Sequence, residues 1–436
     1  MKKQSRYNIW VGNILYNSFT DQLIQFKTNE IDNISYFLNH LEEFESDYPE
    51  LLSKFENKGF VIKSHIDELD NIVFQNRKAV FLDRHYHLTI NPTLECNYHC
   101  WYCCVEAEGT KYERRRMDDK TIQIVKKHIQ YAVDKERVNS LFIDWFGGEP
   151  LMYFKEVIYP IAEYASELCN KKKIPYSNHI TTNAYYLDNS MIEAFKKIQV
   201  NSFQIPIDGS EKKHNSVKNM NNIGHYWQIV QNINTLCETM DNITIVLRIN
   251  YDSQTLKTIL PVIDHIIPSN RKNITVDFQR VWQIDLNRDE KGNNVLLLET
   301  KRAFEKAGFN TMYFAFKHKT NKCCYSDNFY HRVINYDGKI FKCTAYDYPD
   351  DLVIGSFNED GSITINEEIV SKMFSDPPFK NEKCLSCIKL PLCYGPCVQK
   401  YYDTKIGKMS FLCSYDFSEI SLEEYIKDKA LQQLEK

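Results

Sequence analysis

Between residues 86 and 280, predicted strands alternate with amphipathic helices, and this alternation constrains the fold more than any other feature of the sequence. Parallel strands joined by helical crossovers bring the carboxyl ends of all strands to one edge of a sheet. We therefore predict a curved or partly closed parallel α/β sheet whose functional loops follow the strands. The six predicted strands are Tyr86–Ile90, Ser140–Phe146, Ser177–Thr182, Ser202–Ile207, Ile243–Ile249 and Ile274–Arg280. The predicted helices are Asp119–Lys135, Tyr153–Lys172, Asn189–Ile198, Gly224–Met240 and Ser253–Ile266.

The segments on either side of this alternation have a different pattern. At the N-terminus, Asn8–Val11 and Ile14–Asn17 flank Gly12-Asn13, which predicts a hairpin. A third strand over Gln22–Phe26 and three helical patterns follow, as in a winged-helix-like α+β unit. The alternation ends near residue 290, and a helix is predicted from Phe417 onward. We predict domains at residues 1–85, 86–290 and 291–416, with a C-terminal helix at 417–436.

Composition excludes several classes of protein. With 436 residues, 43% of them hydrophobic and 26% charged, the chain is too long for one small module and too apolar for wholesale disorder. The formal charge of -4 predicts neither nucleic-acid binding nor attraction to an anionic membrane. No signal-peptide core or long apolar run is present, so we expect a cytoplasmic protein. In a reducing compartment, the 14 cysteines indicate metal binding rather than disulfides.

The first cysteine cluster is the C-x3-C-x2-C segment formed by Cys96, Cys100 and Cys103, directly after the first strand. Three thiolates on one short loop can converge on a metal or a cluster and leave one coordination position open. An open position predicts chemistry at the metal. The alternative is an incomplete zinc site, with Cys104 or His99 as the fourth ligand.

A second, larger array of cysteines lies near the C-terminus. One part has the spacing C-x2-C-x5-C-x3-C with a further cysteine beyond it, and the other has C-x13-G-x4-C around Gly338. Seven or eight thiols suit two clusters better than one site. Two structural zinc sites are the alternative, because four sulfur ligands fit either metal centre. The cysteines are Cys324 and Cys343 in the upstream part and Cys384, Cys387, Cys393, Cys397 and Cys413 in the downstream part.

Polar groups follow the ends of several predicted strands. Gly147-Gly148-Glu149-Pro150 offers a backbone that a ligand can approach closely and a carboxylate that could bind an ammonium group. Thr182-Asn183 ends the next strand, and Arg248 and Asn250 lie on a later one. Because a buried arginine without an anion is unfavourable, Arg248 needs either an anionic ligand or an internal carboxylate partner.

On these motifs, residues 86–290 resemble the radical SAM superfamily. The resemblance implies a partial (β/α)6 barrel in which Cys96, Cys100 and Cys103 hold a catalytic 4Fe-4S cluster that chelates S-adenosyl-L-methionine. Reductive cleavage of that cofactor then yields a 5'-deoxyadenosyl radical, which abstracts a hydrogen atom from the substrate. By the same resemblance, Tyr102 lies near the adenine and the Gly147-Gly148-Glu149 segment receives the methionine amino group. Further cofactor-binding positions are Thr182, Asn183, Arg248 and Asn250. The sequence identifies no catalytic base.

The C-terminal array resembles the SPASM domain, an auxiliary-cluster extension of radical SAM enzymes that modify peptides. The resemblance implies one 4Fe-4S cluster on Cys384, Cys387, Cys393 and Cys413, and a second on Cys324, Cys343 and Cys397. Cys323 is adjacent to Cys324, and either of the two could be the ligand. The expected cofactors are therefore S-adenosyl-L-methionine and three 4Fe-4S clusters.

An auxiliary-cluster domain indicates a peptide or protein substrate. The N-terminal unit resembles the leader-recognition domain of ribosomal-peptide (RiPP) maturases, although it could also be a cap that packs on the barrel. This resemblance implies two partners, a precursor peptide with a leader and a reductant such as flavodoxin or ferredoxin. The product would be a thioether or another cross-link, or an epimerised residue.

The sequence leaves two other functions open. Sulfatase-maturating relatives, which form formylglycine, carry a carboxylate directly after the cysteine of the G-x4-C segment. Here that position is Thr344, with Asp347 three residues further on, so the match fails there. The hypothesis from another class is a non-catalytic zinc-binding protein that recognises peptides. Iron and sulfide content would distinguish it from an enzyme.

Overall fold

The computed structural model describes residues 1–105, 116–281, 290–312, 321–345, 347–375, 378–410, 413, 415, 418 and 420–434. The chain packs as two compact units, each of which combines segments that are distant in sequence. The first unit contains Met1–Asp83, Ala315–Asn328 and Lys372–Lys436, and the second contains Arg84–Phe314 and Phe329–Ser371. In the described part of the chain, every helix is too short or too polar to cross a membrane.

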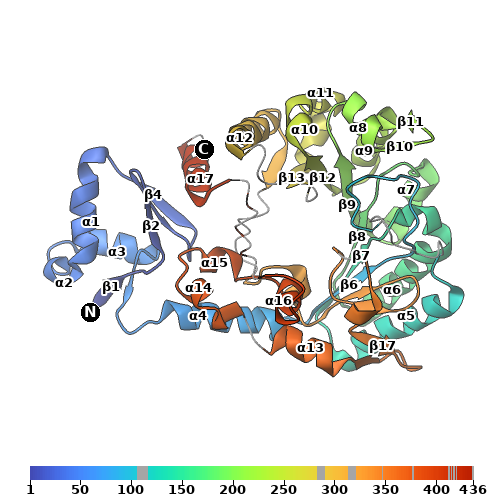
Figure 1. Ribbon diagram of the computed structural model, residues 1–436, viewed down its shortest axis with the longest axis horizontal. Coiled ribbons are helices and arrows are strands. Elements are labelled where there is room, and N and C mark those ends of the chain that lie inside the picture. The colour runs from blue at the N-terminus through green and yellow to red at the C-terminus, as the bar shows by residue number, and fades with distance from the viewer. Residues whose placement is uncertain are drawn as a thin grey trace. The chain divides into compact units, whose positions relative to one another are not determined.

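The second unit is built on an 11-stranded sheet of order β14-β13-β12-β9-β8-β7-β6-β15-β16-β17-β18. From β14 to β15 all neighbours are parallel, and β15 to β18 continue as an antiparallel meander. Figure 1 shows the parallel strands with helices along their outer side. The parallel strands are β6 (His85–Ile90), β7 (Ser140–Trp145), β8 (Tyr176–Thr181), β9 (Val200–Ile207), β12 (Thr244–Tyr251), β13 (Ile274–Arg280), β14 (Asn310–Met312) and β15 (His331–Ile334). The last three are β16 (Ile340–Phe341), β17 (Gly355–Phe357) and β18 (Ile363–Ile365).

All six predicted strands are confirmed to within two residues at either end. Their side chains alternate between a buried apolar face and a more polar face: in β7, Leu141, Ile143 and Trp145 are fully buried, whereas Phe142 and Asp144 are less so. This period of two is why the strands could be read from sequence. The helices between them are α5 (Asp119–Tyr131), α6 (Tyr159–Lys172), α7 (Asn189–Lys197), α8 (Glu211–Val217) and α9 (Tyr226–Thr239), with a small hairpin of β10 (Asn219–Met220) and β11 (Ile223–Gly224) after α8.

Two details of the predicted alternation were wrong. The helix predicted at 253–266 is two helices, α10 (Ser253–Thr258) and α11 (Val262–His265), because Pro261 lies between them and disfavours a helical conformation in the residue before it. The alternation also does not end near residue 290. Helix α12 (Glu290–Lys306) leads into β14, which pairs in parallel with β13. A strand of three residues is too short to give a periodic signal.

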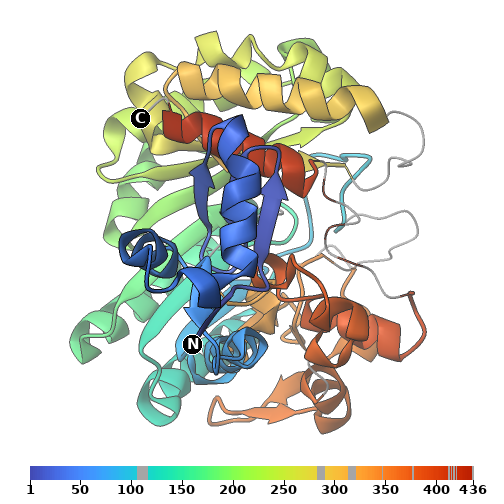
Figure 2. The ribbon, with the colours of Figure 1, turned by 90° about the vertical axis from the view of Figure 1, so that its left-hand side faces the viewer.

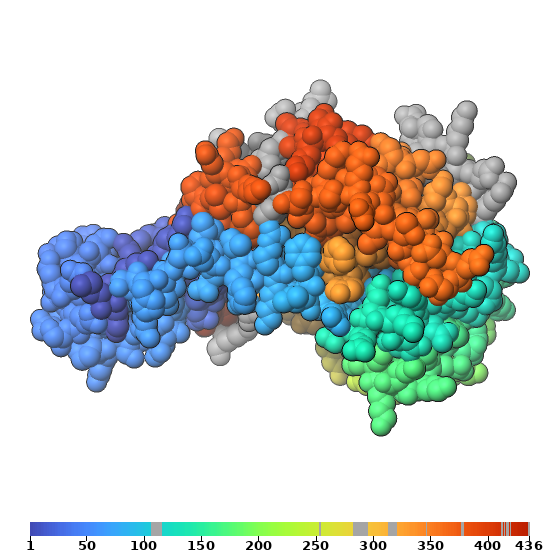
Figure 3. Space-filling view, turned by 90° about the horizontal axis from the view of Figure 1, so that it is seen from below, coloured from blue at the N-terminus to red at the C-terminus, as the bar shows by residue number. Residues whose placement is uncertain are grey.

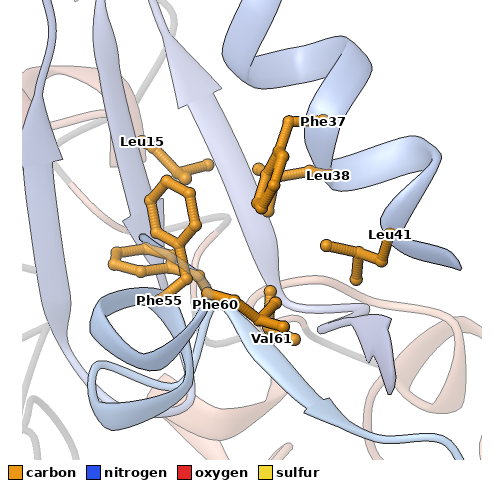
Figure 4. Close-up of a cluster of buried hydrophobic side chains, with 8 residues drawn as sticks. Leu15, Phe37, Leu38, Leu41, Phe55, Phe60 and Val61 are labelled. Atoms are coloured by element: carbon orange, nitrogen blue, oxygen red, sulfur yellow. The ribbon is translucent and has the colours of Figure 1, made fainter. Parts of the chain in front are cut away.

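The N-terminal part of the first unit has the predicted hairpin. Strands β2 (Asn8–Val11), β3 (Ile14–Asn17) and β4 (Gln22–Gln25) form an antiparallel sheet in that order. Strand β1 (Lys2–Gln4) pairs with β5 (Val61–Lys63). Three helices lie between β4 and β5 in the sequence: α1 (Ile31–Asn39), α2 (Leu41–Phe44) and α3 (Pro49–Asn57). Figure 4 shows the apolar core that joins these helices to the sheet, with Leu15, Phe37, Leu38, Leu41, Leu52, Phe55, Phe60 and Val61.

The C-terminal segment packs against the N-terminal segment within this first unit. Tyr7 and Ile72 share a core with Phe379, Leu390 and Tyr394. Figure 3 shows the light-blue segment that contains α4 (Glu68–Arg77) beside the orange and red C-terminal residues. The remaining helices are α13 (Glu367–Phe374), α14 (Glu382–Leu385), α15 (Leu390–Cys393), α16 (Val398–Lys405) and α17 (Leu422–Leu434).

Helix α17, which corresponds to the predicted C-terminal helix, lies on the β2-β3-β4 sheet (Figure 2). Its Tyr425 ring meets the Tyr16 ring edge to face at 6.4 Å between centroids. Lys429 also forms an ion pair with Asp21, at the turn before β4. One face of the sheet is therefore covered by a helix from the far end of the same chain.

Candidate metal centres

The loop after β6 brings Cys96, Cys100 and Cys103 together, and all three thiols are half-buried. Burial raises the pKa of Cys100 to about 11, although the Lys218 ammonium opposes this. Burial also raises the pKa of Cys96, and the nearby Glu149 carboxylate and the thiols of Cys100 and Cys103 raise it further. The raised pKa values of Cys96 and Cys100 suit a positively charged metal centre, which stabilises thiolates. The donor set therefore fits the cluster that the sequence predicts.

The Gly147-Gly148-Glu149 turn packs directly on this loop. The backbone N–H of Gly148 donates to Thr93 O at 3.1 Å, and that of Glu149 donates to Glu95 O at 2.7 Å. A Cβ atom on Gly148 would lie 1.9 Å from Glu95 O, and one on Gly147, whose φ is +109°, would lie 2.2 Å from Thr93 O. The close approach that these glycines permit is thus made to the cysteine loop itself.

Glu149 is fully buried and connects three segments of the site. Its carboxylate accepts hydrogen bonds from Leu151 N (3.0 Å), Thr182 Oγ1 (2.7 Å) and Asn183 N (2.8 Å). Burial raises its pKa to about 7, and the hydrogen bonds partly oppose that rise. Among the described residues, Oε1 accepts two of these bonds and Oε2 accepts one. One acceptor position therefore remains for a further donor such as an ammonium group.

Asn183 continues this network to the cysteine loop. Its side-chain amide donates to Asn97 Oδ1 at 2.7 Å and lies 3.9 Å from Cys96 Sγ. A hydrogen-bond donor beside a thiolate ligand is a common feature of iron–sulfur sites. Glu149, Thr182 and Asn183, which the sequence predicts as cofactor-binding residues, thus converge on one side of the loop.

Tyr102 belongs to a second buried network, on Asp208 and Lys218. The Tyr102 hydroxyl donates to Asp208 Oδ1 at 2.6 Å, and Lys218 Nζ donates to Asp208 Oδ2 at 2.5 Å and to the Tyr102 hydroxyl. Burial alone would raise the pKa of Asp208, but Lys218 and His214 hold it below its usual value. Lys218 also donates toward the Cys100 thiol. A buried, neutralised ion pair therefore lies against the cysteine loop.

Arg248 and Asn250 extend this second network. Asn250 Nδ2 donates to the Tyr102 hydroxyl at 3.2 Å, and Arg248 Nε donates to Asn250 Oδ1 at 3.0 Å. Both residues lie on β12, so the sheet positions them beside the loop after β6. Sequence reasoning missed Lys218 and gave Asp208 no role. Lys218 follows the short helix α8, and no motif or spacing connects it to the cysteines.

Four of the C-terminal thiols gather in the first unit. Burial raises the pKa of Cys393 to about 12, and Cys387, Cys384 and Cys413 raise it further, so all four lie within electrostatic reach of one another. The N–H of Lys389 donates to Cys387 Sγ at 3.4 Å and that of Gly395 to Cys393 Sγ at 3.3 Å. Such N–H donors stabilise thiolate ligands.

The three cysteines predicted for the second auxiliary cluster are divided between the units. Cys324 and Cys397 belong to the first unit, and Cys343 belongs to the second. Cys343 follows β16, and its Sγ accepts the N–H of Ala345 at 3.4 Å. Gly338, in the predicted G-x4-C segment, closes the β15–β16 turn with a φ of +79°, which favours glycine.

Within the described residues, no group of three histidines, cysteines or acidic residues is arranged to hold one metal ion.

Comparison with known proteins bears on the fold and on the superfamily of the central part of the chain. Residues 90–265 match the family model of the radical SAM superfamily. No curated protein matches the chain. The predicted fold class is confirmed: it is an α/β radical SAM fold, and the cysteine-rich C-terminal region is consistent with a SPASM-like domain.

Solved structures with the same fold extend over most of the chain. Native anSMEcpe with bound AdoMet has 16% sequence identity and a TM-score of 0.57, over 80% of this chain and 100% of that one. SuiB of Streptococcus suis bound to S-adenosylmethionine has 18% identity and a TM-score of 0.51, over 92% of this chain and 96% of that one. SuiB bound to its precursor peptide SuiA matches with 18% identity and a TM-score of 0.52, over the same shares of the two chains.

Proposed function

We propose that this protein is a radical SAM maturase that modifies a ribosomally made precursor peptide in the cytoplasm. The observation that carries the proposal is the convergence of two buried polar networks on one loop with three thiols. When bound, a 4Fe-4S cluster and S-adenosyl-L-methionine supply a one-electron route to a radical that removes a hydrogen atom from the substrate. The chain's residues hold, orient and shield these groups.

Each network has a separate part in this proposal. Cys96, Cys100 and Cys103 hold the cluster and leave one iron position open for the cofactor. The remaining acceptor position on Glu149 binds the cofactor's ammonium group. Arg248 supplies positive charge for a carboxylate, and Asn250 and Tyr102 lie beside it to contact the nucleoside. Burial of both networks excludes water, which strengthens these interactions.

The β2-β3-β4 sheet supports recognition of a leader peptide. In the part of the chain that the structure describes, β4 pairs only with β3, so its outer edge is available for an added strand. Gln22 and Gln25 are exposed on this strand. A peptide that adds to an edge is held by backbone hydrogen bonds and needs little sequence specificity. SuiB, which has the same fold, has been solved with its precursor peptide SuiA.

The C-terminal thiols would hold two auxiliary clusters, one on Cys384, Cys387, Cys393 and Cys413 and one on Cys324, Cys343 and Cys397. A modification that forms a cross-link removes two hydrogens and two electrons from the peptide. Abstraction of a hydrogen atom would remove the first hydrogen with one electron, and the second hydrogen would leave as a proton. The C-terminal thiols would hold a cluster that could take up the second electron.

The test is mass spectrometry of a short peptide encoded beside this gene, co-expressed anaerobically with the protein. The control is the Cys96→Ala/Cys100→Ala/Cys103→Ala variant. We expect a loss of two hydrogens that requires these cysteines. An unchanged peptide together with intact cofactor cleavage would reject the peptide and direct the search to protein substrates. Zinc without iron or sulfide would instead support the non-catalytic peptide-binding alternative.

A further inference from the structure

A single buried carboxylate joins the two cysteine-bearing turns of the first unit. Asp327 is 5% exposed. Its Oδ2 accepts the backbone N–H of Cys324 at 2.9 Å, and its Oδ1 accepts the backbone N–H of Val398, the residue after Cys397, at 2.8 Å. These bonds connect segments that are about 70 residues apart in sequence. Both carboxylate oxygens are therefore used to hold backbone next to a thiol.

The two cysteines occupy equivalent places in their turns. Cys324 is the N-cap of the 3-10 turn Tyr325–Asp327, and Cys397 is the N-cap of α16. The first N–H groups of a helix have no partner within it, so the carboxylate satisfies one at each turn. Its negative charge also stabilises the N-terminus of α16. One residue thus binds the backbone beside two thiols on two different elements.

The Cys324 turn is anchored on its other side as well. Asn321 accepts a hydrogen bond from the Tyr394 hydroxyl at 2.7 Å through its side chain, and its carbonyl accepts one from Asn76 Nδ2 at 2.8 Å. Cys323 lies within electrostatic reach of Tyr415, as do Cys387 and Cys393. Asn321 and Asp327 thus anchor the turn on both sides of Cys324.

We propose that Asp327 is a positioning residue that presents Cys324 and Cys397 as a fixed ligand pair for the second auxiliary cluster, and that it thereby selects Cys324 over Cys323. This inference rests on the proposed function, because that function assigns auxiliary clusters to these thiols. Asp327 does not touch the cluster in this proposal. It acts through the backbone of its two neighbours.

The test uses the full chain with Cys96→Ala/Cys100→Ala/Cys103→Ala, so that only auxiliary clusters remain. Two auxiliary 4Fe-4S clusters contain about eight iron atoms per chain. In this background we expect Asp327→Ala to retain about four iron atoms and to lose one of two electron paramagnetic resonance signals of the reduced protein. We expect Cys324→Ser likewise to retain about four iron atoms and to lose one signal. We expect Cys323→Ser to keep about eight iron atoms and both signals.

The control is Asp67→Ala. Asp67 also caps a helix of the first unit, since it accepts hydrogen bonds from Leu69 N (2.8 Å) and Asp70 N (3.4 Å), but no cysteine adjoins it. A merely structural effect would lower the stability of both variants and leave both resonance signals unchanged.

If Asp327→Ala fails to fold, Asp327→Asn, which has nearly the same volume, replaces it. We expect Asn to alter the spectrum of one cluster only, because its amide cannot accept both N–H groups.

Three results decide between the possibilities. Full iron content and two unchanged signals in Asp327→Ala or Asp327→Asn would overturn the positioning role. Loss of iron in Cys323→Ser but not in Cys324→Ser would overturn the ligand assignment. A background protein that binds zinc and no iron would overturn the proposed function, and the inference with it. The first two results leave the proposed function intact.

Discussion

The cysteine loop of the second unit and the cysteine turns of the first unit hold thiols in different surroundings. The loop is enclosed by buried charges and polar side chains: Glu149 on one side, and the Asp208–Lys218 pair on the other. Cys384 in the first unit packs instead against an apolar core that includes Phe379 and Leu390. Nearby thiols there accept backbone N–H groups.

The difference follows from what each region has to bind. Buried ionisable groups reduce stability unless they are paired, so they are retained where a charged ligand is bound or a geometry must be fixed. Apolar packing and backbone donors suffice to hold a cluster that exchanges only electrons. The comparison therefore supports the proposal that the second unit binds a charged cofactor and that the first unit holds auxiliary clusters.

The largest expected effect comes from breaking the buried pair beside the loop. Lys218→Met leaves the Asp208 charge buried and should lower the free energy of unfolding of the metal-free protein by about 3–5 kcal/mol. The control is Lys213→Met, which breaks a more exposed pair with Asp252 and should cost about 0–1 kcal/mol. Urea unfolding measures both. Equal losses of stability in the two variants would mean that the buried Asp208–Lys218 pair is no more important than an exposed pair. The double variant Lys218→Met/Asp208→Asn should recover part of the lost stability, because it leaves no unpaired charge buried.

The next effect is a pH dependence that arises from Glu149. Its pKa is raised from 4.5 in the unfolded chain to about 7 in the folded protein. The folded state therefore binds more protons than the unfolded state between pH 4.5 and pH 7, and stability falls as pH rises through this window. The fall amounts to roughly 3 kcal/mol at 1.36 kcal/mol per pKa unit.

Glu149→Gln should remove this fall, because the amide does not titrate. Denaturant unfolding of the metal-free wild-type and variant proteins at pH 4.5, 5.5 and 7 gives the difference directly. Parallel pH profiles for the two proteins would show that Glu149 is as ionised in the folded protein as in the unfolded chain. That result would contradict the rise in its pKa that burial predicts.

Gly148→Ala should have a smaller effect on stability. It should also change the metal content selectively. The added Cβ would overlap Glu95 O of the cysteine loop, at a cost of about 1–3 kcal/mol. We expect iron to fall from about twelve to about eight atoms per chain, because only the catalytic cluster is lost. Gly12→Ala is the control, since its φ of +56° strains the alanine while no atom lies within 4 Å of the added Cβ, and it should leave all of the iron in place. Loss of auxiliary iron in Gly148→Ala would show that the two regions are not independent.

Much of this architecture could be predicted because it depends on local pattern. The Asn8–Asn17 hairpin follows from its turn residues, and the strands follow from alternating side chains. The cysteine sets follow from spacing. Lys218 and Asp327 could not be found in this way, because each acts on residues that only the fold brings near: Lys218 on Tyr102, and Asp327 on Val398. Cys324 lies only three residues before Asp327, but the bond to Val398 depends on the fold.

The central claim is that the loop of Cys96, Cys100 and Cys103 carries the radical chemistry and the first-unit thiols do not. The most direct test compares two triple variants, Cys96→Ala/Cys100→Ala/Cys103→Ala and Cys384→Ala/Cys387→Ala/Cys393→Ala. Each should lose one cluster and retain about eight iron atoms per chain, so metal content is matched. The measurement is 5'-deoxyadenosine formed from S-adenosyl-L-methionine under reducing, anaerobic conditions. We predict that formation falls to background in the first variant and persists in the second. Persistence in the first variant, or its loss in a folded second variant with eight iron atoms, would contradict the account.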